Sequence, residues 1–483
     1  MKKYSLKIAV ILVLMATVLA SCGKEFLNTD QTNAVDSTIA FRVPSDLVQG
    51  MHGVYFALSR AGFMGRNAVL FGDMNADKMN KRAAGDLTFV NIELYAFGDT
   101  EGTFDGTWLE GYRVVNFAQR VIEEGAKMLD EYQGNAAALS TIHTQMAEAH
   151  ALRAFALFRL VNMFGLPYSA AARNTLAIIA EDRFIYADET PELSTVGEAY
   201  DLILLSINRA KTHFTSGDGS FRPFYMNLAA VHALEARVHL YMRNWQAAIT
   251  SANAALTASG ATIEMNRERF VAMWGQDAAS AEDIFSIRVT LANWLQASSL
   301  ATYFNTYGGS INHSFYNEFA ANDMRRGLFV RHTTADPTFW RPMKHPNATS
   351  INNIRIFGAP EMHLIIAEAQ TELGTDLGAA RTALLQVARR NPAITTVAHL
   401  PDNQADLRTF IAEERARELF QEGHRWFDLR RTGALMTRPT DETRRDIVNY
   451  DVSRFVYPIP FREINIPGSK IQQRPNWQSY FPN

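Results

Sequence analysis

The spacing of apolar residues constrains the fold of this chain more than any other feature of its sequence. Beyond the first 21 residues, apolar side chains recur mostly at positions i, i+3, i+4 and i+7, over windows of about 15 to 25 residues. This is the period of an α-helix with one buried face. Strand-like runs are few and short, and the two clearest are 284–289 and 455–459. The sequence therefore predicts a mainly α fold.

The predicted helices come in pairs with alternating small and large residues. Short stretches at 237–249 and 367–381 resemble tetratricopeptide helices, in which Ala and Gly let neighbouring helices approach closely. No strict 34-residue period runs through the chain, so the repeat is degenerate. The pairs expected are 108–126 with 136–164, 196–213 with 227–242, 245–258 with 360–373, and 377–390 with 407–423, which gives helical regions at about 108–164, 196–258 and 360–423.

Two long segments, at about 65–104 and about 263–356, interrupt the helical pattern. The second contains Gly308-Gly309 and several prolines, which break helices. A disordered linker would be poor in aromatic residues, but this segment is rich in Trp, Tyr and Phe. Irregular segments on a rigid scaffold often carry binding sites. We therefore expect the ligand-binding part of the protein here.

The single cysteine, Cys22, directly follows a leader of the secretory type. Three lysines precede an apolar stretch, 8–20, which is too short to cross about 30 Å of hydrocarbon comfortably. Small residues stand immediately before Cys22, as in the lipobox of bacterial lipoproteins. We therefore expect 1–21 to be a lipoprotein signal peptide and 22–483 to be a mature body anchored by lipid on Cys22. An ordinary secretory signal that contains a cysteine is the alternative.

Composition excludes several classes of protein. Apolar residues make up 47% of the chain and charged residues 20%, which is typical of a globular protein. The net charge of −3 becomes −6 without the three lysines of the leader, and no long basic run is present. We therefore expect no nucleic-acid partner. The motifs GxSxG, GxxxxGK[ST] and HExxH are absent, so the chemistry that they carry is not indicated.

The stretch 413–433 is the most charge-dense part of the sequence. Glu414, Glu418 and Glu422 fall at four-residue spacing on one helical face, and arginines are interleaved with them. Paired carboxylates can serve acid–base catalysis, but arginines close enough to pair with them favour a structural network. Gly423 is expected to cap the C-terminus of this helix.

Two other sets of residues share a helix face. Trp108, Tyr112 and Asn116 are four residues apart, and such a stripe indicates core packing more often than a binding platform. His232 and His239 are seven residues apart. We expect packed or exposed histidines there, without a metal.

The run from Asp73 to Asp77 begins like the calcium loop of an EF-hand. Lys78 stands where that loop needs a glycine, and Ala84 stands where it needs a bidentate glutamate. We therefore expect no metal site of this kind and no cofactor. A calcium ion held together with loops elsewhere remains an alternative.

Five stretches form a pattern in this order along the chain. They are CGKEFL at 22–27; the Trp108, Tyr112, Asn116 helix; RAFALFRLVNMFGLPY at 153–168; EERARELFQEGHRWFDLRRTG at 413–433; and YPIP at 457–460 followed by EIN at 463–465. With them the chain resembles, over nearly its whole mature length, the SusD/RagB-like family of outer-membrane nutrient-binding lipoproteins.

The resemblance implies a non-enzymatic protein that captures a glycan, or in some members a peptide. Such a protein sits as a lid on a TonB-dependent, SusC-like barrel in the outer membrane, lipid-anchored and exposed at the cell surface. The implied fold is mainly α, with tetratricopeptide-like helix pairs forming a right-handed cradle, an irregular loop-rich ligand-binding half and few short strands.

A glycan site needs flat rings for the apolar faces of sugars and planar polar groups for their hydroxyls. The two irregular segments offer candidates of both kinds. Packing beneath the segment is the alternative for each ring. The ring candidates are Trp294, Tyr303, Tyr307, Tyr316 and Trp340, and the polar candidates are Asp73, Asp77, Asn312, Arg325 and Arg341.

Three functional classes remain open on the sequence. Capture of an oligosaccharide is preferred, with capture of a peptide as its nearest variant. A helical-repeat scaffold that binds only protein is the second. The third is an α-rich glycoside hydrolase, which needs two carboxylates about 5 to 10 Å apart in a cleft.

Overall fold

The computed structural model describes residues 40–81, 88–186, 188–331, 340–347, 349, 351–438 and 446–482. Cys22 and the predicted signal peptide lie outside this range. The described part is mostly helical with few short strands, so the predicted mainly α fold is confirmed. None of the helices in these ranges is long and apolar enough to cross a membrane.

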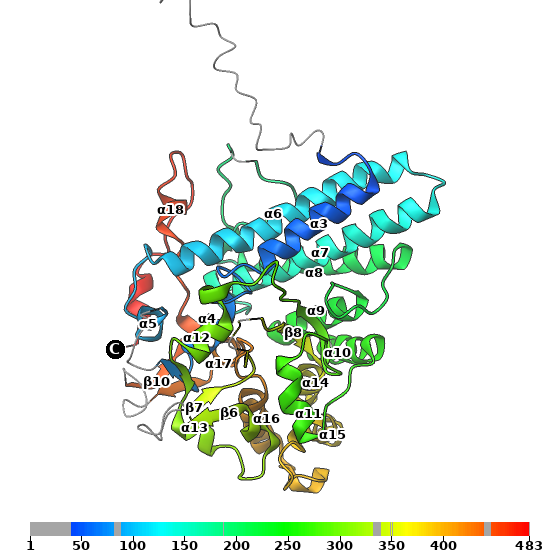
Figure 1. Cartoon of the computed structure of the whole chain (residues 1–483). Coiled ribbons are helices and arrows are strands. Elements are labelled where there is room, and N and C mark those ends of the chain that lie inside the picture. The colour runs from blue at the N-terminus through cyan, green and yellow to red at the C-terminus, as the bar shows by residue number, and fades with distance from the viewer. Residues whose placement is uncertain are drawn as a thin grey trace, which may run out of the picture.

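Long helices from the first half of the chain form a layer and are seen side by side in Figure 1. Helix α7 packs between α6 and α8, and α3 lies against α6 and α7. From Ile142 onward nearly every residue of α7 is buried, because helices cover it on several sides. The predicted bounds of α7 are confirmed. The helices are α3 (Pro44–Leu58), α6 (Gly102–Glu131), α7 (Ala136–Phe164) and α8 (Val196–Ser216).

The second helical group is built from hairpins, and its pairing differs partly from the prediction. Only Met242 to Asn244 separates α9 from α10, and such a short connection makes the two helices antiparallel neighbours. Because α9 pairs with α10, α8 packs mainly on α7 and not on α9 as predicted. Helix α10 also packs on α14, as predicted. The helices are α9 (Leu228–Tyr241), α10 (Trp245–Ser259), α14 (Ala359–Leu373), α15 (Leu377–Ala388) and α16 (Gln404–Glu418).

The two irregular segments join in one four-stranded antiparallel sheet of order β1-β5-β7-β6. Met79 of the first segment pairs with Ile311 of the second, and Ile311 pairs with Trp340. The elements are α4 (Asn67–Met74), β1 (Met79–Lys81), α5 (Val90–Glu93), α11 (Arg267–Ala272), η2 (Met273–Gly275), β4 (Asp283–Ile287), η3 (Gln296–Ser298), α12 (Leu300–Asn305), β5 (Gly309–Ile311), α13 (His313–Asn317), η4 (Met324–Leu328), β6 (Phe329–Arg331), β7 (Trp340–Pro342) and β8 (Ile354–Gly358).

The predicted strand at 455–459 is wrong, whereas the one at 284–289 is confirmed as β4, paired with β8. Residues 455–459 are buried but have no ladder partner in the described ranges. Pro458 and Pro460 cannot donate the backbone hydrogen bonds of a strand. The remaining elements are β2 (Leu176–Ile178), β3 (Ser194–Thr195), η5 (Val397–His399), α17 (Arg425–Thr432), β9 (Leu435–Arg438), β10 (Ile447–Asp451), η6 (Val452–Arg454), α18 (Phe461–Ile464) and η7 (Trp477–Tyr480).

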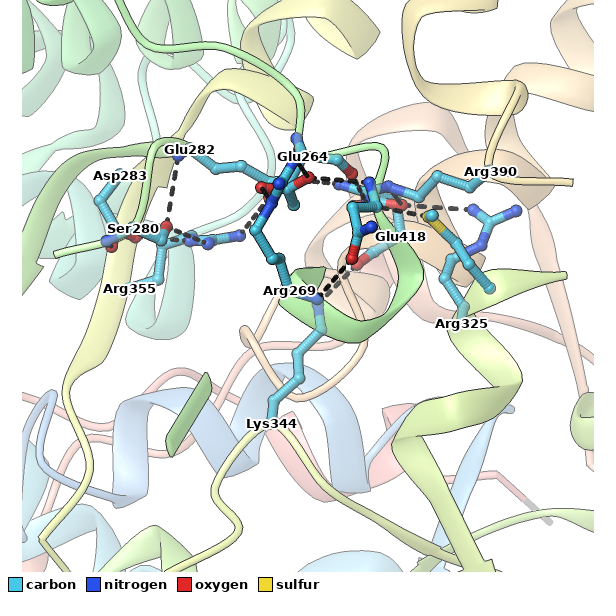
Figure 2. Close-up of polar contacts among 12 residues, drawn as sticks. Glu264, Arg269, Ser280, Glu282, Asp283, Arg325, Lys344, Arg355, Arg390 and Glu418 are labelled. Carbon is cyan, nitrogen blue, oxygen red and sulfur yellow. Dashed lines mark hydrogen bonds and ion pairs between the residues drawn. The ribbon is translucent and has the colours of Figure 1, made fainter. Parts of the chain in front are cut away.

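A chain of buried ion pairs ties α16 to the second irregular segment (Figure 2). Arg325 contacts Asp323 and Glu414 at 2.7 Å each, and Glu418 at 3.3 Å. Glu418 also contacts Arg390 at 3.0 Å. Arg390 continues the chain through Glu282 to Arg355, which is 3.1 Å from that carboxylate. The structural interpretation of the charge-dense stretch is confirmed, although most partners come from distant elements.

Gly423 does not cap α16, which ends at Glu418 with Leu419 as its C-cap. Its role is a close approach between two backbones. Gly423 has a φ of 74°, in the left-handed region, and its amide donates to Asp73 at 3.1 Å. A Cβ atom on Gly72 of α4 would lie 2.1 Å from the carbonyl oxygen of Gly423. Two glycines therefore let α4 pack against the turn that precedes α17.

Candidate ligand-binding surface

Two of the predicted rings meet at the four-stranded sheet. Tyr316 of α13 and Trp340 of β7 stack with their centroids 3.7 Å apart and their planes at 9°. Arg326 lies over the Tyr316 ring at 4.6 Å, and Arg331 lies over the Trp340 ring at 5.4 Å. Since Tyr316 occupies one face of the indole, we infer that Arg331 covers the other. The Trp340 indole donates to His313 Nδ1 at 3.3 Å, which fixes its orientation.

The other three ring candidates divide by burial. Trp294 precedes α12 in the sequence and Tyr307 follows it. Both are half-buried, and Tyr307 packs partly against the core. Tyr303, within α12, is fully buried, with the Lys81 ammonium 5.0 Å from its ring centroid. Tyr303 therefore packs beneath the surface, which was the alternative to binding.

Most of the polar candidates hold the irregular half together. Asp77 accepts two hydrogen bonds of 2.7 Å from Arg425, and its carbonyl accepts one of 2.7 Å from Asn312. Burial alone would raise the pKa of the Asp77 carboxyl, but the Arg425 guanidinium outweighs it and lowers that pKa. Arg325 is buried in the ion-pair chain. Arg341, half-buried beside Trp340 on β7, lies next to the ring stack, as does Asn312, whose carbonyl accepts a hydrogen bond from the Tyr316 amide.

Asp73 is buried and does not reach the surface. Burial raises the pKa of its carboxyl to about 8, although the Gly423 amide favours the charged form. Between Asp73 and Asp77, the Asn75 side chain donates to Ile92 and accepts from the Tyr457 hydroxyl. Side-chain oxygens of Asp73, Asn75 and Asp77, the residues that match the start of a calcium loop, thus have protein partners. In the ranges described, no three His, Cys, Asp or Glu side chains gather as a metal site would require.

Asp73 makes the stability of the protein depend on pH. Its pKa of about 8 in the folded protein lies above the ordinary value of 3.8, so folding takes up a proton between those values. Stability therefore falls as the pH rises through this window. Asp73→Asn imitates the neutral carboxyl. Urea unfolding should therefore show that the free energy of unfolding of the variant, relative to that of the wild type, increases between pH 5 and pH 8. Parallel pH curves for the two proteins would contradict this assignment.

The stripe of Trp108, Tyr112 and Asn116 both packs and lines a pocket. Tyr112 and Asn116 hydrogen-bond the backbone of Ile179 and Ile185, which fastens the neighbouring loop to α6. Trp108 is buried, as expected of core packing. These side chains also border a pocket of about 430 Å³, together with residues such as Tyr186 and Ile466. Sequence reasoning missed the pocket because its walls come from three distant segments.

The larger pockets described here do not coincide with the ten predicted ligand residues. Those of about 340, 430, 470 and 550 Å³ are lined by other side chains. The half-buried Tyr316–Trp340 stack therefore lies outside these pockets, and its binding role stays a prediction. The same holds for Trp294, Tyr307 and Arg341.

Comparisons with known proteins agree with the architecture. A family model described as "Starch-binding associating with outer membrane" matches residues 25–240, and the SusD family model matches 269–477. SusD-like protein P38 of Formosa agariphila is 23% identical, over 98% of this chain and 99% of that protein.

Solved structures share the fold. A SusD superfamily protein from Bacteroides thetaiotaomicron has a TM-score of 0.78 at 22% identity, covering 90% of this chain and 100% of its own. A SusD-like carbohydrate binding protein from Bacteroides vulgatus has a TM-score of 0.69 at 18% identity, covering 82% and 85%. The two family models divide nearly the whole described chain between them. The chain therefore belongs to the SusD/RagB-like family.

Proposed function

We propose that the protein is a cell-surface lipoprotein that captures an oligosaccharide and passes it, chemically unchanged, to a partner TonB-dependent transporter in the outer membrane. The family description, starch binding at the outer membrane, supports the ligand class and the location. The lipobox before Cys22 supports the anchor. The observation that carries the proposal is the Tyr316–Trp340 stack on the sheet that joins the two irregular segments.

The stack offers a flat platform that a sugar can share. Arg331, which covers the outer face of Trp340, is exposed and can swing aside at little cost. A pyranose ring then takes its place, with its C–H groups on the indole. Stacking contributes about 0.5 to 1.5 kcal/mol beyond area burial, and Arg341 and the displaced Arg331 supply hydrogen bonds to hydroxyls. With a second ring, the dissociation constant falls in the range of about mM to µM.

Trp340→Ala is expected to weaken oligosaccharide binding about tenfold, because it removes the stacked face and leaves Tyr316 without its partner. Isothermal titration calorimetry on the mature chain, with a panel of neutral oligosaccharides, measures the change. Phe461→Ala, which removes another partly exposed ring far along the chain on α18, is the matched control and should bind like the wild type. Equal affinity in the Trp340 variant and the wild type would contradict this surface.

The same preparation tests the other classes. A peptide panel on the calorimeter would reveal the peptide-binding variant of the function. Release of new reducing ends from an oligosaccharide would overturn the non-enzymatic assignment. Co-purification with a barrel from the outer membrane tests the partner, and binding that survives a chelator tests the proposal that no calcium ion is needed.

A further inference from the structure

A pocket of about 550 Å³ lies where the loop after α7, the turn between α9 and α10, α17 and η6 meet. Its lining is unusual in charge: it contains five arginines and neither aspartate nor glutamate. The arginines are Arg243, Arg430, Arg431, Arg454 and Arg474. A concave site with one sign of charge concentrates ligands of the opposite sign.

Carboxylates outside the lining neutralise only part of this charge. Arg431 pairs with Glu368 and Asp428, at 2.8 Å in each case, and Arg454 lies 3.4 Å from Asp451. These contacts leave the side chain of Arg454 largely exposed, at 75%. Arg431 is thus firmly tied to acids, and Arg454 only loosely.

Arg243 and Arg430 have no carboxylate partner among the residues that the structure describes. Buried Arg430 donates to the carbonyls of Asn162 and Gly165, at the C-terminal end of α7, and stacks over Trp426 at 4.6 Å. Exposed Arg243 donates to the carbonyl of Arg431 at 2.9 Å. Carbonyls offset a guanidinium charge less than a carboxylate does, so positive charge remains in excess at the pocket.

The backbone holds Arg243 at the pocket at an energetic cost. Its φ of 60° is in the left-handed region, which is unfavourable for a residue other than glycine. In the same pocket, burial lowers the pKa of Arg430 to about 10, and repulsion from Arg474 acts in the same direction. A bound anion would relieve this repulsion.

The rest of the lining fits a sugar. Leu166, Pro167 and Tyr168 form an apolar side, and Ser169 and Ser453 bring hydroxyls. The volume is within the range of about 300 to 1,000 Å³ that is usual for small-ligand sites. A pocket of this size suits a substituent on one or two sugar rings better than the large contact of a protein partner.

We propose that this arginine pocket binds an oxyanion carried by an oligosaccharide, either a sulfate ester or the carboxylate of a uronic acid. Arginine forks match the planar or trigonal array of oxygens of such groups. Arg243 and Arg454, the exposed members, contact the anion, while Arg430 supplies fixed charge at the floor. This inference rests on the proposed function only in assuming that the anion is attached to a saccharide.

The test compares a double variant, Arg243→Asn with Arg454→Gln, with the wild type. Asparagine tolerates the left-handed backbone at position 243. Arg269→Gln with Arg462→Gln is the matched control, because those guanidinium groups are also largely exposed, at 72% and 84%, and lie outside the pocket. Calorimetry at 50 and 150 mM NaCl uses four probes: a sulfated carrageenan tetrasaccharide, tetragalacturonate, a neutral maltotetraose and a pentaglutamate peptide.

We expect the wild type to bind one or both anionic tetrasaccharides, more weakly at higher salt, and the probe that binds identifies the oxyanion. The pocket variant should lose about 10- to 100-fold in affinity, as expected for lost charged hydrogen bonds, while the control stays within about twofold. No binding of either anionic sugar, an equal loss in both double variants, or binding of pentaglutamate alone would overturn the proposal. Binding of neutral sugars that depends on Trp340 is a separate readout, so failure here leaves the proposed function standing.

Discussion

Replacing Arg325 with methionine should lower the free energy of unfolding by about 3 to 5 kcal/mol, the usual cost of removing one partner from a buried ion pair. Methionine fills much of the space but offers no hydrogen-bond donor. Asp323, Glu414 and Glu418 would keep buried carboxylates without their shared cation. Because the ion-pair chain joins α16 to the second irregular segment, that segment should loosen first.

The loss should depend on pH with a definite sign. Burial raises the pKa of Asp323 and of Glu414, but Arg325 outweighs burial and holds both below their ordinary values. Their stabilisation is therefore present at neutral pH and lost as the pH falls through the folded-state values. Without Arg325 these carboxyls can accept protons at higher pH, so the difference between variant and wild type should shrink toward pH 4.

Urea unfolding followed by circular dichroism measures the effect of the Arg325 substitution. Arg269→Ala is the control, since Arg269 makes an ion pair with Glu264 while 72% exposed, and such pairs contribute about 1 kcal/mol or less. If the Arg325 variant lost no more than this control, the buried chain would not stabilise the fold as argued.

Gly72→Ala should destabilise the protein by about 3 kcal/mol or more, at the upper end of the usual cost of overpacking. The new Cβ would lie 2.1 Å from the carbonyl oxygen and 2.3 Å from the carbonyl carbon of Gly423. Both are backbone atoms, so no side chain can rotate away. Either α4 or the turn before α17 must move, and the hydrogen bond from Gly423 to Asp73 would be lost.

The thermal midpoint measures the effect of Gly72→Ala, with Gly102→Ala as the matched control. Gly102 is also in a helix, and a Cβ there would meet nothing within 4 Å. The control should be neutral or slightly stabilising, because alanine favours helix. A Gly72 variant as stable as the Gly102 variant would show that the two backbones separate at little cost.

Helix positions followed from the sequence because they depend on local periodicity. The predicted 136–164 helix has those bounds in the structure, and the two tetratricopeptide-like stretches fall on the turns of real hairpins. Partner choice was harder. The eight expected helices do not reveal that α8 prefers α7 to α9, since this depends on the length of the connection and on the packing of the whole layer.

The candidate site was less accessible to sequence reasoning. The aromatic cluster indicated a segment in which some rings lie near the surface. The sequence does not show whether an individual ring packs inward, as Tyr303 does, or lies near the surface, as Trp340 does. Ion-pair partners were equally hidden. Arg325 and Asp77 carry charges that suit a ligand, and nothing local indicates that Glu414 and Arg425 already occupy them.

The contacts of Asp77 make the folding of the first irregular segment depend on parts of the chain far along the sequence. Its carbonyl bonds Asn312, 235 residues further along, and its carboxylate bonds Arg425, 348 residues further along. β1 therefore keeps an unpaired edge until β5, in the second irregular segment, comes to lie beside it. The sheet that joins the two irregular segments thus closes only when distant parts of the chain have come together, and an exposed strand edge before that point can pair with other chains.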